Sequence, residues 1–96
     1  MSDISFIDQL QTIIRQRIDD GSNTSYTASL AASGIKRVAQ KLGEEGVELA
    51  LASVAGDEEE VVNEAADLIY HLLVLLRLQD LSFEDVCEVL RQRHTN

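Results

Sequence analysis

The sequence predicts an all-α protein. Proline is absent from the 96 residues, glycine occurs five times and aromatic residues make up 4% of the chain, a composition that favours helices over β-sheets. Apolar residues recur at steps of three and four, the spacing of a helix face, as at Ile35, Val38 and Leu42. The chain is long enough for one hydrophobic core and too short for two. We therefore expect residues 1–96 to form a single all-α domain.

The first predicted helix runs from Asp3 or Ser5 to Asp20. Its apolar side chains share one face: Phe6, Leu10, Ile13 or Ile14, and Ile18. Gly21 follows at a position where glycine commonly ends a helix, because it adopts a left-handed backbone at little cost. A polar loop over residues 21–26 is expected next.

The second predicted helix is capped by Ser25 or Thr27 and continues to about Ala55. Gly34 lies near its start and offers an alternative, because glycine weakens a helix interior. In that alternative the helix is shorter and begins at Ile35.

Two further helices complete the predicted fold. Gly56 ends the second helix, and Asp57 caps a third that runs to about Asp80. So short a turn makes these two helices an antiparallel hairpin. Ser82 opens a fourth helix that reaches about Arg93. We expect a four-helix bundle-like protomer with this hairpin at its centre.

The third predicted helix contains an unusually apolar stretch. From Leu68 to Leu78 nine of eleven residues are apolar, and only His71 and Arg77 interrupt them. A helix without a polar face must be covered on several sides, and four modest helices in one chain offer little cover. We therefore expect a homodimer with the helix over residues 57–80 at its centre.

The composition also bears on partners and location. With 17 Asp and Glu against 8 Lys and Arg, the net charge is −9, which argues against nucleic acid and against an anionic membrane as partners. The longest apolar run, residues 72–76, is too short to cross a bilayer, and residues 1–3 lack the basic start of a signal peptide. The one cysteine, Cys87, excludes an internal disulfide and fits the reducing cytoplasm; we expect it to be a small core residue.

Two acidic pairs lie at mirrored distances from the glycine of the predicted turn: Glu45 and Glu48 before it, Glu64 and Asp67 after it. Glu48 and Glu64 are each eight residues from that glycine, and the outer acids are each eleven. In two helical arms equal counts mean equal heights, roughly 12 Å and 16 Å from the turn. Each pair is spaced i,i+3 and so shares a helix face. We expect these carboxylates to converge, with Glu44 beside them.

The simplest alternative is that these acids form a solvated helix face. Against it, Glu45 continues the stripe of Val38, Leu42 and Leu49, where a carboxylate is costly unless something pairs with it. Gly43 and Gly46 flank the acids, and each costs about 1 kcal/mol relative to alanine in a helix interior. Such residues make sense if a ligand or another backbone comes close. The pattern therefore favours a metal site.

Oxygen ligands with little histidine indicate Mg²⁺ or Mn²⁺ rather than zinc or iron. A di-iron bundle would need two Glu-x-x-His pairs, and the corresponding pairs here end in Glu48 and Asp67. His71 lies one turn beyond Asp67. It either tunes the site or contacts substrate, or it is a core or interface histidine.

Three basic residues, Lys36, Arg37 and Lys41, precede the acids. Lys41 is one turn from Glu44 and Glu45, so a simple ion pair is its alternative role. Beside a metal, the same charges would hold the oxyanions of a polyphosphate. The residues alone thus predict a metal-dependent polyphosphate hydrolase, without naming the substrate.

Longer motifs resemble the phosphoribosyl-ATP pyrophosphohydrolase family, one of the all-α nucleoside triphosphate pyrophosphohydrolases that also include the MazG type. The shared pattern of the larger group, Glu-Glu-x-x-Glu and a later Glu-x-x-Asp, is met by Glu44, Glu45, Glu48, Glu64 and Asp67. The narrower family motifs are similar to residues 25–27 (Ser-Tyr-Thr), 41–48 (Lys-x-Gly-Glu-Glu-Gly-Val-Glu), 63–67 (Asn-Glu-Ala-Ala-Asp) and 70–71 (Tyr-His). The resemblance extends from about residue 6 to residue 94.

This resemblance implies Mg²⁺-dependent cleavage of phosphoribosyl-ATP to phosphoribosyl-AMP and pyrophosphate, the second step of histidine biosynthesis, with Mn²⁺ as a substitute metal. It implies a cytoplasmic, dimeric helical bundle. The acids of the larger group's pattern become the catalytic and metal-binding residues. Substrate contacts carried over from the family are Ser25, Thr27, Lys36 and Lys41. Many members have a proline shortly before Ser-Tyr-Thr, whereas residues 21–24 here are Gly-Ser-Asn-Thr.

Two rival functions stay open at this point. A housekeeping nucleoside or deoxynucleoside triphosphate pyrophosphohydrolase of the MazG type would use the same acids on another nucleotide. A non-catalytic helical interaction module would need the apolar helix but not the acids. The number of metal ions, the phosphorus that is attacked and the general base are not fixed by the sequence.

Overall fold

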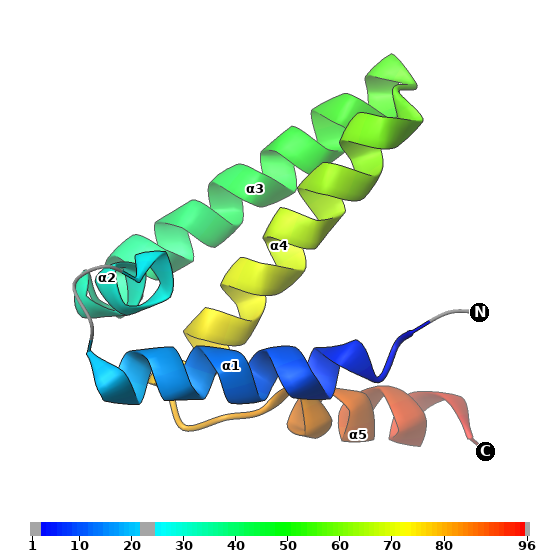
Figure 1. The fold of residues 1–96 in the computed structure, drawn as a ribbon. Helices are drawn as coiled ribbons and strands as arrows, with labels where there is room; N and C mark the ends of the chain where they lie inside the picture. The colour runs from blue at the N-terminus through cyan, green and yellow to red at the C-terminus, as the bar shows by residue number, and fades with distance from the viewer. Residues whose placement is uncertain (1–2, 22–24, 96) are drawn as a thin grey trace.

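The computed structural model describes residues 3–21 and 25–95, and this part of the chain is helical without strands, which confirms the all-α class. Residues 22–24 of the predicted loop lie outside the described residues. Five helices are present in the described part (Figure 1): α1 (Phe6–Asp20), α2 (Tyr26–Ala32), α3 (Ile35–Ala55), α4 (Glu58–Leu78) and α5 (Phe83–His94).

The prediction of one continuous second helix up to Ala55 was wrong. The alternative, a shorter helix that begins at Ile35, is confirmed. Gly34 separates α2 from α3 with φ 93° and ψ 165°, a backbone conformation that favours glycine. The chain therefore leaves one helix and begins another in a new direction. Ser25 caps the short first piece, since its Oγ accepts a hydrogen bond of 3.3 Å from the backbone N–H of Ala28.

The other predicted helix ends are confirmed. Gly21 has φ 64° and donates its N–H to the carbonyl oxygen of Arg17 at 3.2 Å, which closes α1. At α5 the side chains of Ser82 and Asp85 bond each other's backbone N–H groups, at 3.4 Å and 2.9 Å, in a capping box.

The hairpin of α3 and α4 dominates the shape of the molecule. In Figure 1 its two helices run antiparallel and its turn projects away from α1, α2 and α5, which lie around its open end. The core is at that open end, where α1, α2, α3 and α4 contribute buried side chains: Ile14, Leu30, Val38, Leu73 and Val74. The middle of the hairpin is thus held by the packing of α3 on α4.

The apolar stretch of residues 68–78 is covered by its own chain. None of these residues is exposed: three are buried and the other eight are half-buried, so one chain supplies more cover than we expected from the sequence. Helices α1, α2 and α3 supply the cover, because the break at Gly34 lets α2 fold against α4. Large apolar side chains are instead exposed along the projecting hairpin: Val47 at 59%, Leu51 at 65%, Val54 at 88% and Val62 at 67%.

Helix α5 contributes no buried residue. Cys87 lies on it and is exposed, so its expected place in the core was wrong. The apolar residues of α5 are spaced as on a packed helix, although α5 makes few contacts with the rest of the protein. Spacing alone therefore could not show that Cys87 is exposed. Among the described helices none is long and apolar enough to span a membrane.

Candidate metal centre

The turn at Gly56 sets the acidic residues of α3 and α4 opposite one another. Gly56 ends α3 with φ 79° and donates its N–H to the carbonyl oxygen of Ala52 at 3.0 Å. Asp57 caps α4, because its Oδ1 accepts a hydrogen bond of 3.2 Å from the backbone N–H of Glu60. Both helices are therefore regular up to the turn. Residues at equal sequence distances from Gly56 lie at equal distances from the turn along the two helix axes.

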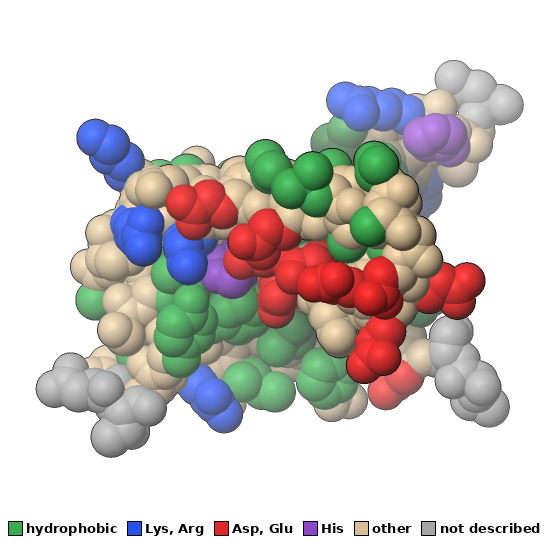
Figure 2. All heavy atoms as spheres, turned by 90° about the horizontal axis from the view of Figure 1, so that it is seen from above, with side chains coloured by type: hydrophobic (Ala, Val, Ile, Leu, Met, Phe, Trp, Pro, Cys, Tyr) green, Lys and Arg blue, Asp and Glu red, His purple; other side chains and the backbone are tan. Residues whose placement is uncertain are grey.

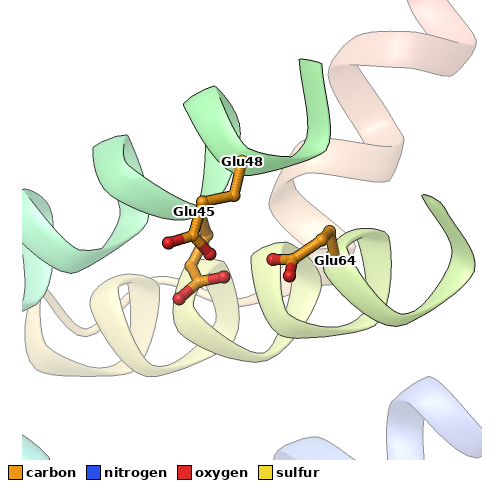
Figure 3. A group of neighbouring side chains, drawn as sticks. All are labelled: Glu45, Glu48 and Glu64. Carbon is orange, nitrogen blue, oxygen red and sulfur yellow. The ribbon is translucent and has the colours of Figure 1, made fainter. Parts of the chain in front are cut away.

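Three carboxylates meet between the two helices. Glu45 and Glu48 extend from α3 and Glu64 extends from α4, and Figure 3 shows the three side chains directed toward one another. One carboxylate oxygen from each lies within 4.8 Å of the others. The mirrored spacing about the turn thus does bring acids of both arms together.

The surroundings of this group are poor for free carboxylates. Glu45 and Glu64 are half-buried, and the Oε2 atom of each is buried with no hydrogen-bond partner among the described residues. Burial, together with the neighbouring carboxyl groups of Glu48 and Glu45, raises the pKa of Glu64 from 4.5 to about 7. Without a cation the Glu64 carboxylate therefore takes up a proton near neutral pH.

A hard divalent cation fits these residues. The donor set is entirely carboxylate oxygen, which Mg²⁺ and Mn²⁺ prefer. A cation would supply the partner that the two buried oxygens lack and would favour the charged form of Glu64, whose pKa is raised by burial and by the neighbouring carboxyl groups. The structure thus offers a site of the expected chemistry at three of the five predicted acids.

The other two predicted acids lie outside this group. Glu44 is exposed, and its carboxylate accepts a hydrogen bond of 3.2 Å from Nε2 of Gln40. It follows Gly43 and precedes Glu45, so it is rotated by about 100° from its inward-facing neighbour. Asp67 is also exposed. Their roles as metal ligands remain predictions.

The Ser-Tyr-Thr segment contacts α4 at Tyr70. Ser25 uses its side chain to cap α2, and the side chain of Thr27 is only 5% exposed. The hydroxyl groups of Thr27 and Tyr70 form a hydrogen bond of 2.6 Å. Direct substrate contacts by Ser25 and Thr27 remain predictions, since both hydroxyl groups already bond within the protein.

The two predicted lysines lie on α3 and form no ion pair with another described residue. Lys36 is exposed and Lys41 is half-buried. The simple alternative for Lys41, an ion pair with Glu44 or Glu45, is therefore not found. Figure 2 shows acidic side chains in a band across one face, with basic side chains and a histidine toward one end of the band. This arrangement suits a ligand with anionic groups, although contacts by the two lysines remain predictions.

Comparison with known proteins identifies the family. The family profile described as phosphoribosyl-ATP pyrophosphohydrolase matches residues 7–94. The chain belongs to this family. The predicted family is thereby confirmed.

The most similar relatives include three proteins named histidine biosynthesis bifunctional protein HisIE. The protein of Yersinia pestis is 57% identical over 97% of this chain, but only 46% of its own length is matched. Those of Vibrio cholerae and Escherichia coli O157:H7 are 53% and 56% identical over 97% and 93% of this chain, and each is matched over 44% of its length. The chain thus spans less than half the length of these relatives.

The sequence left the role of His71 open, and the structure places this residue in the interior. His71 is 5% exposed, and its Nδ1 lies 2.7 Å from the backbone carbonyl oxygen of Asp67. A carbonyl oxygen only accepts, so Nδ1 carries the proton. The Nε2 atom is buried and has no hydrogen-bond partner among the described residues. The Tyr-His motif marked this residue in the sequence, but its contacts are visible only in the folded structure.

The two helical glycines have no packing role within the described chain. A Cβ atom added at Gly43 would meet nothing within 4 Å, and one at Gly46 would make an ordinary 4.0 Å contact with Cδ1 of Leu68. Both positions could therefore accommodate alanine. Their cost to the helix is in line with the prediction that a ligand or another backbone comes close.

Proposed function

We propose that this chain hydrolyses phosphoribosyl-ATP to phosphoribosyl-AMP and pyrophosphate as a step of histidine biosynthesis. The observation that carries the proposal is the group of Glu45, Glu48 and Glu64, in which two buried oxygens have no partner among the described residues. Membership of the phosphoribosyl-ATP pyrophosphohydrolase family supports the choice of substrate. In the reaction, water adds to a phosphorus atom and one P–O–P bridge breaks.

Glu45, Glu48 and Glu64 would hold Mg²⁺, with Mn²⁺ as a substitute. Glu44 and Asp67 are proposed as further ligands or as acids that position water. When bound, the metal would supply a Lewis acid for phosphoryl oxygens and a more acidic water molecule. Pairing with Lys36 and Lys41 would neutralise substrate phosphates, since neither lysine is engaged by a described acid.

The proposed active form is a homodimer in the cytoplasm. Val47, Leu51 and Val54 are exposed at steps of four and three, so they share one face of α3, and Val62 is exposed on α4. A second copy packed along the hairpin would remove this apolar surface from water. The α4 helix, which we predicted at the dimer centre, would contribute through its half near the turn.

A direct test is to incubate purified protein with phosphoribosyl-ATP and Mg²⁺ and to measure pyrophosphate release. A panel of nucleoside and deoxynucleoside triphosphates serves as the comparison. Hydrolysis of phosphoribosyl-ATP far above the panel supports the proposal. Preference for a deoxynucleotide would instead support the housekeeping enzyme, and no metal-dependent release from any substrate would support a non-catalytic module.

A further inference from the structure

A hydrogen bond between two hydroxyl groups ties the start of α2 to the middle of α4. Oγ1 of Thr27 and Oη of Tyr70 are 2.6 Å apart, although 43 residues separate them in the sequence. Burial raises the pKa of the Tyr70 hydroxyl, so it keeps its proton at neutral pH and can donate. Because Thr27 is itself buried, this bond fixes the position of the residue before it in the chain.

That preceding residue presents an aromatic ring to solvent. Tyr26 is 59% exposed, and its ring is stacked on that of Tyr70 with centroids 6.2 Å apart and an angle of 26° between the planes. The stack and the neighbouring hydrogen bond orient Tyr26 without burying it. A flat, largely apolar surface is thus held open at the N-terminal end of α2.

His71 lies between this surface and the face of α4 that carries Glu64. The Tyr70 ring meets the imidazole of His71 edge-on, with centroids 5.1 Å apart and planes at 86°. His71 lies seven residues after Glu64, two helical turns, and therefore on the same face of α4. Tyr70 itself is roughly 9 Å from Glu64 along the helix axis and about 120° around it. Figure 2 shows hydrophobic and basic side chains together beside a histidine at the end of the acidic band.

We propose that Tyr26 determines substrate specificity by stacking on the purine base, and that Thr27 and Tyr70 are positioning residues that hold its ring in place. This inference rests on the proposed function, in which the phosphates occupy the acidic group. A neutral, planar base suits an aromatic surface, because every base offers a π-face for stacking. The roughly 9 Å along α4 between Glu64 and Tyr70, on which the Tyr26 ring stacks, is comparable to the distance between the base and the phosphates of an extended nucleotide.

The kinetic test compares Tyr26→Leu with Tyr26→Phe. Loss of a base–aromatic stack should raise KM for phosphoribosyl-ATP about tenfold in the leucine variant, and phenylalanine should restore it because the ring remains. Inhibition by the product pyrophosphate, which has no base, and kcat should stay near wild type in both. An unchanged KM in Tyr26→Leu overturns the proposal. So does an equal rise in KM and in the inhibition constant of pyrophosphate, which would indicate a general loss of the site.

The positioning residues are tested by Tyr70→Phe, Thr27→Val and the double variant. Each single change removes the hydroxyl bond while nearly keeping side-chain shape, so each should raise KM severalfold, and the double variant should be no worse than either. Thr27→Ser keeps the bond and should restore KM. Additive losses, or failure of serine to restore KM, would overturn the positioning role.

A second readout does not depend on turnover. The chain has two tyrosines, two phenylalanines and no tryptophan, so the Tyr26 ring signals can be assigned by NMR. With Mg²⁺ present, ATP should move these signals upfield by stacking, whereas inorganic tripolyphosphate should not. If ATP moves them but phosphoribosyl-ATP is not hydrolysed, the proposed function fails and the base contact stands. If neither probe moves the Tyr26 signals, or if Tyr26→Leu converts a dimer to monomers, the proposed base contact fails while the proposed function stands.

Discussion

Glu45 on α3 and Glu64 on α4 each keep one carboxylate oxygen buried without a hydrogen-bond partner in the described part of the chain, and the two side chains belong to the same group of three. A single orphaned carboxylate oxygen would be a local defect, costly in a low-dielectric setting. Two such atoms from different helices indicate a shared partner. This relationship motivates the first three predictions.

Replacing Glu48 or Glu64 with glutamine should abolish measurable pyrophosphate release and leave the helical fold intact. Glutamine keeps the shape of the side chain but loses the charge that a divalent cation needs. Activity and circular dichroism should be measured on both variants, with Glu58→Gln, an exposed residue in the first turn of α4, as the matched control. Wild-type turnover in either site variant would show that the site lies elsewhere.

Mg²⁺ should raise the melting temperature of the wild type. Binding to the folded state alone stabilises it by about 2.7 kcal/mol at a hundredfold excess of metal over its dissociation constant. For a small domain this corresponds to a shift of several degrees. Thermal melts with and without Mg²⁺ should give the full shift in Glu58→Gln and little or none in Glu64→Gln. Equal shifts in all three proteins would mean that the metal acts only by charge screening.

The stability of the metal-free protein should fall as pH rises from about 4.5 to about 7. The folded state raises the pKa of Glu64 from 4.5 to about 7, so it binds more protons than the unfolded chain in this range. The stabilising contribution is therefore complete below the unfolded pKa and is lost as pH passes the folded pKa. Denaturant titrations in a chelator at several pH values should show the decline, and Glu64→Gln should make it shallower. An identical slope in the variant would contradict the assignment.

Gly43→Ala should stabilise the fold by about 1 kcal/mol, because glycine in a helix interior is weaker than alanine by that amount and the added Cβ meets nothing within 4 Å. We expect the same variant to lose turnover, since a ligand or another backbone is expected to come close at this position. Melting curves and kinetics on one preparation measure both effects. A stabilised variant with full activity would contradict the idea that a ligand or another backbone comes close to Gly43.

Light scattering should report twice the chain mass at micromolar concentration, and Leu51→Glu should halve it. Leu51 is 65% exposed on the apolar face of α3, and a charge there would be buried without a partner in the proposed dimer. Ser53→Glu is the matched control, because it adds the same charge at an exposed position on another face of α3. A well-folded wild-type monomer, or equal effects of the two variants, would contradict the dimer surface.

Local chemistry predicted much of the fold. The caps at Ser25, Asp57 and Ser82 and the glycine ends of α1 and α3 depend on neighbouring residues only, so the sequence contains their signals. The mirrored spacing likewise predicted that acids of both arms meet. Which carboxylates face the partner helix depends on how α3 and α4 are rotated in the packed hairpin, and spacing could not separate Glu45 and Glu64 from Glu44 and Asp67.

Other features depend on contacts between distant segments. The cover of residues 68–78 follows from the fold of α2 against α4, and the bond between Thr27 and Tyr70 joins positions 43 residues apart. Neither the cover nor this hydrogen bond leaves a pattern among neighbouring residues that a single sequence could reveal. The Ser-Tyr-Thr and Tyr-His motifs marked both ends of that bond, but nothing in them indicated that they touch.

The equal arms of the hairpin limit how the length of this chain can vary. Glu48 and Glu64 are each eight residues from Gly56, and inserting one residue in a single arm would rotate its acid by about 100° and shift it by about 1.5 Å relative to the other. Two whole turns, about seven residues, added to both arms would keep the acids facing each other. Insertions and deletions in related hairpins should therefore occur in matched pairs across the turn. An insertion or deletion in one arm only should be accompanied by loss of catalytic activity.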